Sequence, residues 1–178
     1  MIKKILIVIA VIVAVFATVV AFQPADFRIA RNATFSASPA TVFEQVNDLH
    51  KWQAWSPWAK LDPAAKNEFQ GPPAGTGAVF SWAGNWQVGE GTMTITESRP
   101  GELVRFQLDF RKPMAGTNTA EFTFKPEGDK TVVTWSMSGH NDFKSKAASL
   151  IMNCDKMVGG QFESGLADLK KIVEAAPK

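Results

Sequence analysis

The sequence predicts an α+β protein in which a curved antiparallel sheet of seven strands wraps a long C-terminal helix, preceded by one apolar helix. Three observations support this prediction. Short segments of alternating apolar and polar residues follow one another, separated by turn residues, as in antiparallel strands. The chain ends in a long stretch with apolar residues at helical spacing. A separate apolar run opens the chain. One sheet closing on the last helix buries both apolar faces.

The N-terminal segment, residues 1–23, carries Lys3 and Lys4 ahead of an uncharged run at residues 5–22. A run of this length, as a helix, just spans the hydrocarbon core of a bilayer. The two lysines favour a cytoplasmic N-terminus. We therefore expect a single-pass signal anchor in the cell membrane, with a domain at 24–178 outside the cytoplasm (the periplasm in a Gram-negative cell). A cleaved signal peptide and a buried core helix are the alternatives.

The remainder of the chain has the composition of one neutral globular domain. The 178 residues are 46% hydrophobic and 20% charged, which suits a packed core and not a disordered chain. Lys3 and Lys4 account for the whole formal net charge of +2. A domain without excess positive charge lacks the footprint of a nucleic-acid-binding protein, so we expect no nucleic-acid partner. The single cysteine, Cys154, excludes an intrachain disulfide.

One strand and two short helices are expected before the rest of the sheet. Residues 27–35 alternate in the manner of a half-buried strand. Ser38 and Pro39 then open a helix, because serine caps a helix N-terminus and proline suits the first helical position. The short segment at 47–63 that follows contains three of the six tryptophans: Trp52, Trp55 and Trp58.

Six further strands are expected at residues 67–70, 78–83, 91–97, 103–110, 117–124 and 131–138. Short turns join adjacent strands, so neighbours should pair antiparallel. Each alternates apolar with polar residues, so one face of the sheet should be packed and the other exposed to water. The apolar face is rich in aromatic side chains.

The C-terminal stretch is expected to form one helix over 142–175, capped by Asn141 or Asp142. An apolar stripe should face the sheet, and within it we expect Cys154 to be a buried, unreactive thiol. The stripe consists of Leu150, Cys154, Met157, Val158, Phe162, Leu166, Leu169 and Val173.

Three glycines, at positions 159, 160 and 165, thin this helix. A glycine in a helix interior costs about 1 kcal/mol relative to alanine. Room for a cavity beneath the helix, a kink, or close packing on the sheet would each justify that cost.

The tryptophan segment allows three interpretations. Tryptophan combines a large apolar area with one N–H that needs an acceptor. Trp52, Trp55 and Trp58 therefore plug the end of the core, form a rim or lid over an apolar ligand, or contact a membrane or partner.

Few residues suggest chemistry. His50 and His140 have no metal-ligand spacing with Cys154, so no metal site is assigned. No cofactor and no catalytic residue are assigned either. Asn118 falls on the inward face, where it either satisfies neighbouring backbone or orients a ligand. Glu97 shares the inward parity but lies at a strand end. His140 closes the last strand at the expected cavity mouth, where a surface or capping role is the alternative. Asn118, Glu97 and His140 are the three candidates to test for an acid or base in the cavity.

Several local strings resemble the SRPBCC superfamily, which includes START-like lipid-transfer domains, the birch-pollen-allergen fold and polyketide cyclase/dehydrase proteins. The similarity covers roughly residues 27–175 and is carried by Trp55-Ser-Pro-Trp58, Gly89-Glu-Gly-Thr92, Asn118-Thr-Ala-Glu-Phe122, Val133-Thr-Trp135 and Asp155-Lys-Met-Val-Gly159. It implies the helix-grip fold, with a hydrophobic cavity between the sheet and the C-terminal helix. Members of the superfamily bind lipids, sterols, polyketides or other apolar ligands. A minority are enzymes, a related group activates the Hsp90 chaperone, and no shared catalytic motif transfers.

Three functional hypotheses follow. The first is membrane-anchored binding of a hydrophobic small molecule or lipid, the second an enzyme of polyketide cyclase/dehydratase type, and the third an interaction domain with a vestigial cavity. An exposed apolar patch around the tryptophan segment would favour the third. The residues expected to line the cavity are Trp55, Trp58, Phe80, Trp82, Met93, Phe106, Phe110, Asn118, Phe122, Trp135 and Met157.

Overall fold

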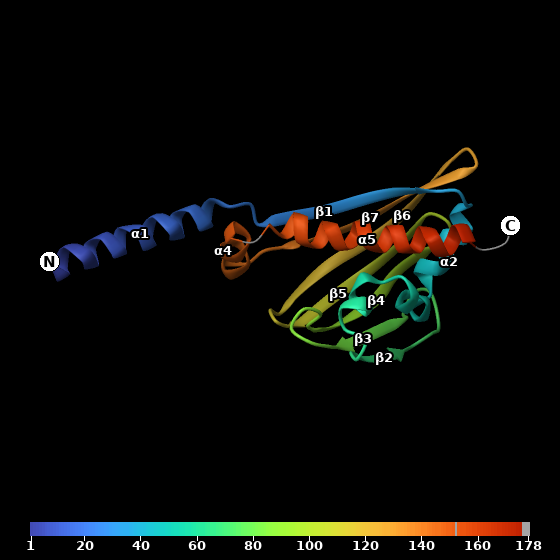
Figure 1. Cartoon of the computed structure of the whole chain (residues 1–178), viewed down its shortest axis with the longest axis horizontal. Helices are drawn as coiled ribbons and strands as arrows, with labels where there is room; N and C mark the ends of the chain where they lie inside the picture. The colour runs from blue at the N-terminus through green and yellow to red at the C-terminus, as the bar shows by residue number, and fades with distance from the viewer. Residues whose placement is uncertain (152, 176–178) are drawn as a thin grey trace.

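The computed structural model (Figure 1) describes residues 1–151 and 153–175. Residue 152, inside the predicted C-terminal helix, and residues 176–178 lie outside the described residues. The elements are α1 (Ile2–Phe22), β1 (Asp26–Phe35), α2 (Pro39–Asn47), the 3-10 helix η1 (Leu49–Ala54), α3 (Pro57–Leu61), β2 (Lys66–Gln70), β3 (Val79–Ala83), β4 (Glu90–Arg99), β5 (Leu103–Lys112), β6 (Gly116–Glu127), β7 (Lys130–His140), α4 (Phe143–Ile151) and α5 (Cys154–Ala175).

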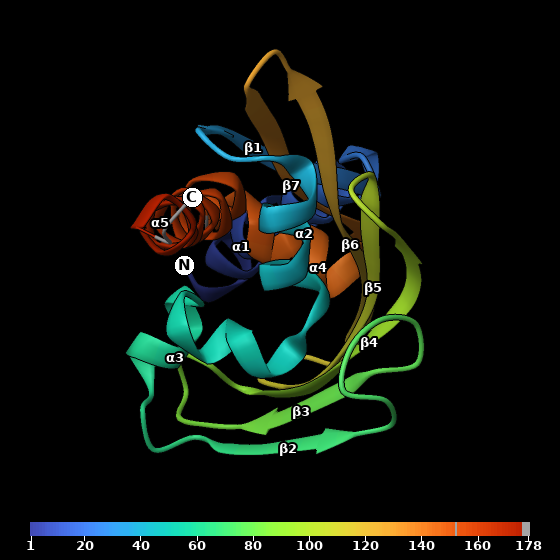
Figure 2. The same ribbon diagram turned by 90° about the vertical axis from the view of Figure 1, so that its right-hand side faces the viewer.

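The seven strands form one sheet in the order β1-β7-β6-β5-β4-β3-β2, and every neighbouring pair is antiparallel. Figure 2 shows the sheet curving round α2 and α5, which lie on its concave side. The predicted fold class is confirmed. Several strands are longer than the alternation predicted, because the hydrogen-bonded ladder continues into the polar ends of the hairpins, as in β6.

Helix α2 begins as its sequence predicts. The Ser38 hydroxyl accepts a hydrogen bond from the Thr41 backbone N–H at 3.3 Å, and Pro39 opens the helix. The apolar stripe of α2, consisting of Val42, Phe43 and Val46, is buried. Because α2 contacts β5, β6 and α5, it closes one end of the space between the sheet and the last helix.

The prediction of one continuous C-terminal helix is wrong. Asp142 caps α4, as predicted, by accepting a hydrogen bond from the Ser145 N–H at 2.8 Å. A second cap follows at Asn153, whose side chain accepts a hydrogen bond from the Lys156 N–H at 2.9 Å. Asparagine competes for backbone N–H groups in this way, and here it begins a new helix, α5.

The predicted apolar stripe is therefore buried over only part of its length. Phe162, Leu166, Leu169 and Val173 are buried under the sheet, as expected. Leu150, Cys154 and Met157 are exposed, because they lie on α4 and on the first turn of α5, beyond the sheet's cover. The prediction that Cys154 is a buried thiol is wrong.

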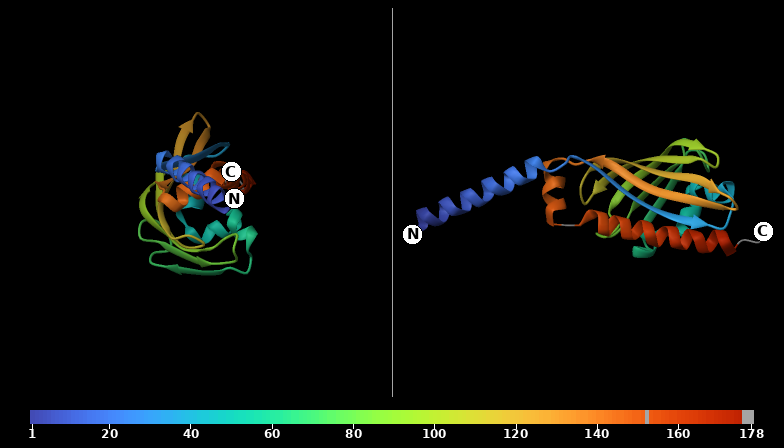
Figure 3. Two further views of the ribbon diagram at one scale, coloured as in Figure 1. Left: turned by 90° about the vertical axis from the view of Figure 1, so that its left-hand side faces the viewer. Right: turned by 90° about the horizontal axis from the view of Figure 1, so that it is seen from above.

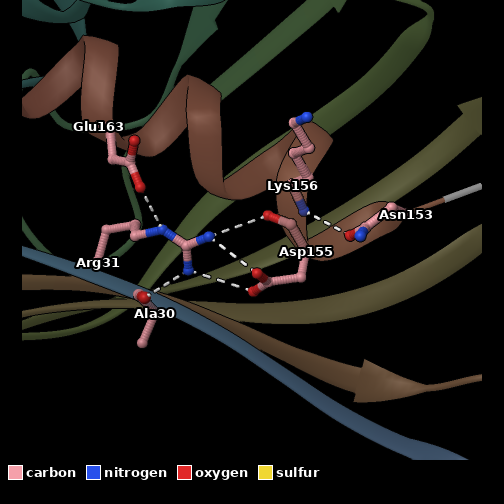
Figure 4. A network of polar contacts seen from close by, with 6 residues as sticks. All are labelled: Ala30, Arg31, Asn153, Asp155, Lys156 and Glu163. Carbon is pink, nitrogen blue, oxygen red and sulfur yellow. Dashed lines mark hydrogen bonds and ion pairs between the residues drawn. The ribbon is translucent and has the colours of Figure 1, made fainter.

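Arg31 of β1 fastens the start of α5 to the sheet (Figure 4). Its guanidinium donates to Glu163 at 2.6 Å and to the Asp155 carboxylate at 2.9 Å. The hydrogen bond from Arg31 holds the pKa of Asp155 below its ordinary value. A Cβ at Gly159 would overlap the Arg31 guanidinium, so this glycine makes room for the ion pairs.

Gly165 is explained in a similar way. A Cβ there would lie 2.8 Å from the Trp135 ring and 3.1 Å from the Pro57 side chain. At Gly160, by contrast, a Cβ would meet no atom within 4 Å. Close packing on the sheet, and not room for a cavity, therefore accounts for the glycines at positions 159 and 165.

Candidate functional site

A cavity of about 200 Å³ lies between the concave face of the sheet, the η1–α3 segment and α5. Most of its wall is apolar, and aromatic rings from both the sheet and the helices contribute. The lining residues are Trp52, Gln53, Ser56, Trp58, Ala59, Asp62, Ala65, Asn67, Phe80, Trp82, Val88, Met93, Leu108, Phe110, Ala120, Trp135, Met137, Val158 and Phe162.

Trp135 of β7 is the centre of the aromatic wall. Its ring stacks on Phe162 of α5 with centroids 4.2 Å apart and on Phe122 of β6 with centroids 4.6 Å apart. It also meets the rings of Trp52, Trp55 and Trp58 edge to face. Aromatic pairs of these geometries add about 0.5–1.5 kcal/mol each beyond area burial. The sheet and α5 are therefore joined through one aromatic cluster that also faces the cavity.

The tryptophan segment is divided between core and cavity. Trp55 is fully buried and does not line the cavity, so it plugs the core. Trp52 is also buried but lines the cavity, and Trp58 is half-buried on the cavity wall. The indole N–H groups of Trp52 and Trp55 donate to the backbone carbonyls of Val46 and Gln45. The segment leaves no exposed apolar patch at Trp52 and Trp55.

The structure places the predicted cavity residues in three groups. Six of them line the cavity: Trp58, Phe80, Trp82, Met93, Phe110 and Trp135. Trp55, Phe106 and Phe122 are fully buried in the core behind it. Asn118 and Met157 do not line it, and Met157 is 55% exposed on the first turn of α5. Contact of any of these residues with a ligand stays a prediction.

Asn118 lies at the end of the inward face and not on the cavity wall. Its amide occupies the space over Gly139 of β7, where a Cβ would overlap the amide oxygen, and its Nδ2 lies 4.0 Å from the Met137 sulfur. Because Gly139 has no side chain, the half-buried Asn118 amide can lie over it.

The other two candidates for an acid or base, Glu97 and His140, do not line the cavity either. Thr96 is an extra residue in β4, because Ile95 pairs with Phe106 while Glu97 pairs with Arg105. This β-bulge reverses the alternation and puts Glu97 on the outer face, where it forms ion pairs with Arg99 and Arg105. His140 is exposed, and its Nδ1 lies 2.8 Å from the Asp26 carboxylate.

The sequence analysis missed several lining residues. Leu108 and Met137 share the parity of predicted inward residues, so the alternation contained a signal for them. Asp62 and Ala65 lie in the loop between α3 and β2, whose position depends on tertiary packing. The Asp62 carboxylate accepts hydrogen bonds from the backbone N–H groups of Ala64 and Asn85. It is the one acidic side chain among the described residues that line the cavity.

Two indoles on the wall are candidate hydrogen-bond donors to a ligand. Trp82 donates its N–H to the Val88 carbonyl at 3.2 Å, so this donor is already occupied. Among the described residues, Trp58 and Trp135 have no acceptor for their Nε1, and neither nitrogen is a buried atom lacking a partner. Both N–H groups therefore reach accessible space, and Trp58 and Trp135 both line the cavity.

Within the described residues, no group of three or more His, Cys, Asp or Glu side chains is arranged to hold a metal ion. One helix in the same residues, Ile2–Phe22, is long and apolar enough to cross a membrane. A retained anchor and a signal sequence share these properties. The division at residues 1–23 and 24–178, and the side of the membrane on which the domain lies, stay predictions.

A curved antiparallel sheet closed on a C-terminal helix, with an aromatic cavity between them, defines a helix-grip protein. A family model described as "Polyketide cyclase / dehydrase and lipid transport" matches residues 26–174. The chain therefore belongs to this family, and its resemblance to the SRPBCC superfamily is confirmed. The family suggests binding of a hydrophobic ligand or a cyclase-like role.

Solved structures share this fold at low sequence identity. A protein from Nitrosospira multiformis has a TM-score of 0.61 at 18% identity, covering 84% of this chain and 97% of that chain. A protein from Chromobacterium violaceum has a TM-score of 0.60 at 17% identity, covering 86% and 100%. The Aha1 dimer from Colwellia psychrerythraea has a TM-score of 0.58 at 16% identity, covering 85% and 99%. The search of curated proteins found no match.

Proposed function

We propose that this protein binds an apolar small molecule, or one hydrocarbon chain of a lipid, in the cavity beneath α5. In this proposal α1 holds the domain at the membrane. The observation that carries the proposal is the continuous aromatic wall contributed by β3, β5, β7, η1, α3 and α5. Small-molecule sites are mostly apolar and use a few polar groups for orientation. The N–H groups of Trp58 and Trp135 are suited to that second role.

The cavity volume favours a slender or compact ligand. Its volume of about 200 Å³ lies below the range of about 300–1,000 Å³ that is typical of pockets for drug-sized ligands. This is enough for a small ring system or the end of a single chain, and too little for a complete two-chain lipid. A longer chain would extend through the mouth of the cavity.

The apolar wall supplies the driving force. Burial of apolar area contributes about 25 cal/mol per Å², so each 100 Å² of apolar surface that a ligand covers corresponds to about 2.5 kcal/mol before the costs of association. Binding is therefore expected to be driven by burial of apolar area, with little dependence on salt.

The two other hypotheses have less support. A cyclase or dehydratase needs an acid or base in the cavity, and neither Glu97 nor His140 lines it. Asp62 does line it, but its carboxylate already accepts two backbone hydrogen bonds. An interaction domain with a vestigial cavity was expected to expose the tryptophan segment, whereas Trp52 and Trp55 are buried.

Energy transfer from the cavity tryptophans to a fluorescent polyene fatty acid tests the proposal. The full chain is reconstituted in phosphatidylcholine nanodiscs, and the probe is titrated. The test variant is Ala120→Leu, which places a larger side chain on the cavity wall. The matched control is Ala167→Leu, at an exposed position of α5. Circular dichroism establishes that both variants are folded.

We expect saturable transfer with the native chain and with Ala167→Leu. Ala120→Leu should bind the probe at least about tenfold more weakly, corresponding to about 1.4 kcal/mol or more. Equal affinity in all three proteins would place the probe outside the cavity and refute the proposal.

A further inference from the structure

The exposed apolar side chains of the domain gather at one end. Five large apolar residues that follow α1 are exposed among those the structure describes, and Trp86 is the most exposed of them at 84%. Trp86 lies between β3 and β4, and Met114 between β5 and β6. The other three are on α4 or at the start of α5: Phe143, Leu150 and Met157.

Strand register puts these five residues at the end of the sheet from which α1 departs. Asp26, which follows α1, pairs with His140 at the end of β7, and Asn118 near the start of β6 pairs with Gly139. A Cβ at Gly89 would overlap the Lys112 carbonyl, so the β3–β4 and β5–β6 loops adjoin each other. Figure 3 shows α4 lying across the junction between α1 and the domain.

Helix α1 fixes where this end lies relative to a bilayer. Its 21 residues, at about 1.5 Å each, span about 32 Å, close to the hydrocarbon thickness of about 30 Å. Helix α4 contacts α1, and Val20, in the last turn of α1, is fully buried. With α1 in the membrane, α4 therefore lies at the level of the lipid headgroups.

The charge of α4 fits that location. Lys144 and Lys146 are its charged residues, it contains no acidic residue, and neither lysine forms an ion pair among the described residues. Phe143 and Leu150 on the same short helix are exposed. Lysines beside exposed apolar side chains are typical of a helix lying on an anionic membrane surface.

The cavity opens toward the same end. Along β5 the inward residues change from the fully buried Phe106 to the half-buried Leu108 and Phe110 as the strand approaches α1. On α5, Phe162 is buried and Val158, one turn nearer to α1, is half-buried. Exposure of the inward face thus increases toward α1 on both walls of the cavity.

The rim of the cavity lies beside the exposed apolar residues. Val88, in the same loop as Trp86, lines the cavity, and so does Val158, which follows Met157. Asp62, also on the rim, is tied to this loop because it accepts a hydrogen bond from the Asn85 N–H at 2.6 Å, and the rim continues to the exposed Gln53 and Asn67, whose side chains are hydrogen-bonded to each other. On this side the mouth is therefore bordered by the same loops and helix ends that expose apolar side chains.

We infer that this end is a membrane-contact surface, formed by Trp86, Met114, Phe143, Leu150 and Met157, and that the cavity opens within it toward the bilayer. This inference rests on the proposed function for the identity of the cargo. An apolar ligand then passes between the bilayer and the cavity without crossing water. Transfer through water would be the step with the greatest free-energy cost for such a molecule.

The single cysteine provides a direct test, because Cys154 is exposed on the first turn of α5, three residues from Met157. The full chain is labelled there with an environment-sensitive fluorophore and reconstituted in nanodiscs of phosphatidylcholine with phosphatidylglycerol. Some of the lipids carry a spin label near the headgroup. The control carries the label at Asp129→Cys, in the β6–β7 turn at the opposite end, in a Cys154→Ser background.

We expect the label at position 154 to lose most of its emission to the spin-labelled lipid and the label at 129 to keep its emission. The double variant Trp86→Ser/Met114→Ser should shift the docked-to-undocked ratio by about tenfold or more toward undocked. The control pair Lys125→Ser/Glu127→Ser, at the far end of β6, should leave quenching unchanged.

Absence of quenching at position 154 would overturn the inference. Protection of the label from water without quenching by lipid would also overturn it, and would indicate a protein partner instead. Quenching that the Trp86→Ser/Met114→Ser variant leaves unchanged would also overturn it. Binding of the polyene probe, measured in the same samples, reports separately on the proposed function. Loss of docking with retained binding, and docking without binding, are therefore distinguishable.

Discussion

Replacement of Trp135 by alanine is expected to destabilise the protein more than any exposed substitution. Its ring is 2% exposed and contacts aromatic residues of the sheet, of η1, of α3 and of α5. Trp135→Ala removes a side chain that touches all of these elements. Lys125→Ala truncates a side chain of β6 that is 77% exposed at the opposite end of the sheet, and it is the matched control.

The expected magnitude follows from the burial. Truncation of a buried tryptophan to alanine costs about 3–5 kcal/mol, and the stacking on Phe122 and Phe162 places this site at the upper end of that range. For a domain of this size, about 4–5 kcal/mol corresponds to a fall in Tm of about 8–20 °C. The control should change the free energy of unfolding by less than about 0.5 kcal/mol.

Thermal unfolding of the full chain in nanodiscs, followed by circular dichroism in the far ultraviolet, measures both variants. The β-sheet signal reports the domain separately from the helix in the bilayer. If Trp135→Ala and Lys125→Ala lower Tm equally, the aromatic cluster does not join the sheet to α5, and the packing described above is incorrect.

Further predictions concern the last helix and its ion pairs. Gly165→Ala should lower the free energy of unfolding by about 1–3 kcal/mol, because its Cβ would press on Trp135 and Pro57. Gly160→Ala should raise the free energy of unfolding by up to about 1 kcal/mol, because its Cβ would meet no other atom within 4 Å. Chemical denaturation that ranks the two variants in the opposite order would contradict the packing. Because the pKa of Asp155 is lowered in the folded state, its contribution to stability is present above the ordinary aspartate pKa of about 3.9 and is lost as the pH falls below it. Asp155→Asn should therefore flatten the fall in Tm at acidic pH, and an unchanged profile would show that Arg31 does not stabilise the folded carboxylate.

The alternation of apolar and polar residues was sufficient to predict the sheet. In β5, Phe106, Leu108 and Phe110 face inward as the alternation requires, and the short turns imposed antiparallel pairing. The same parity failed at Glu97, because the bulge at Thr96 inserts one residue into β4. A bulge has no periodic signal, so the alternation cannot locate it.

The helical periodicity was less informative near α1. The apolar spacing continues through Leu150 and Met157, so the pattern alone suggested one long helix. The cap at Asn153 divides this stretch into two helices. In addition, helical spacing does not distinguish an exposed apolar residue that faces a membrane from one that faces a core. Similarly, the residues at positions 159 and 165 are glycines because of Arg31 and Trp135, which are remote in sequence.

Six of the eleven predicted cavity residues line the cavity because they lie on strands or helices whose inward faces were predictable. The rim was not predictable, since Asp62 and Val88 are in loops that only the assembled fold brings together. Sequence parity also does not distinguish a residue behind the cavity wall, such as Phe122, from one on its surface, such as Trp135.

Native mass spectrometry of the full chain, released from nanodiscs prepared with its own membrane lipids, tests the central claim most directly. Lipids around α1 should be present equally on the native chain, on Ala120→Leu and on Ala167→Leu. The account predicts one additional bound apolar mass on the native chain and on Ala167→Leu that is absent from Ala120→Leu. Identical spectra for all three proteins, with no mass that depends on Ala120, would contradict the claim that the cavity holds an apolar ligand.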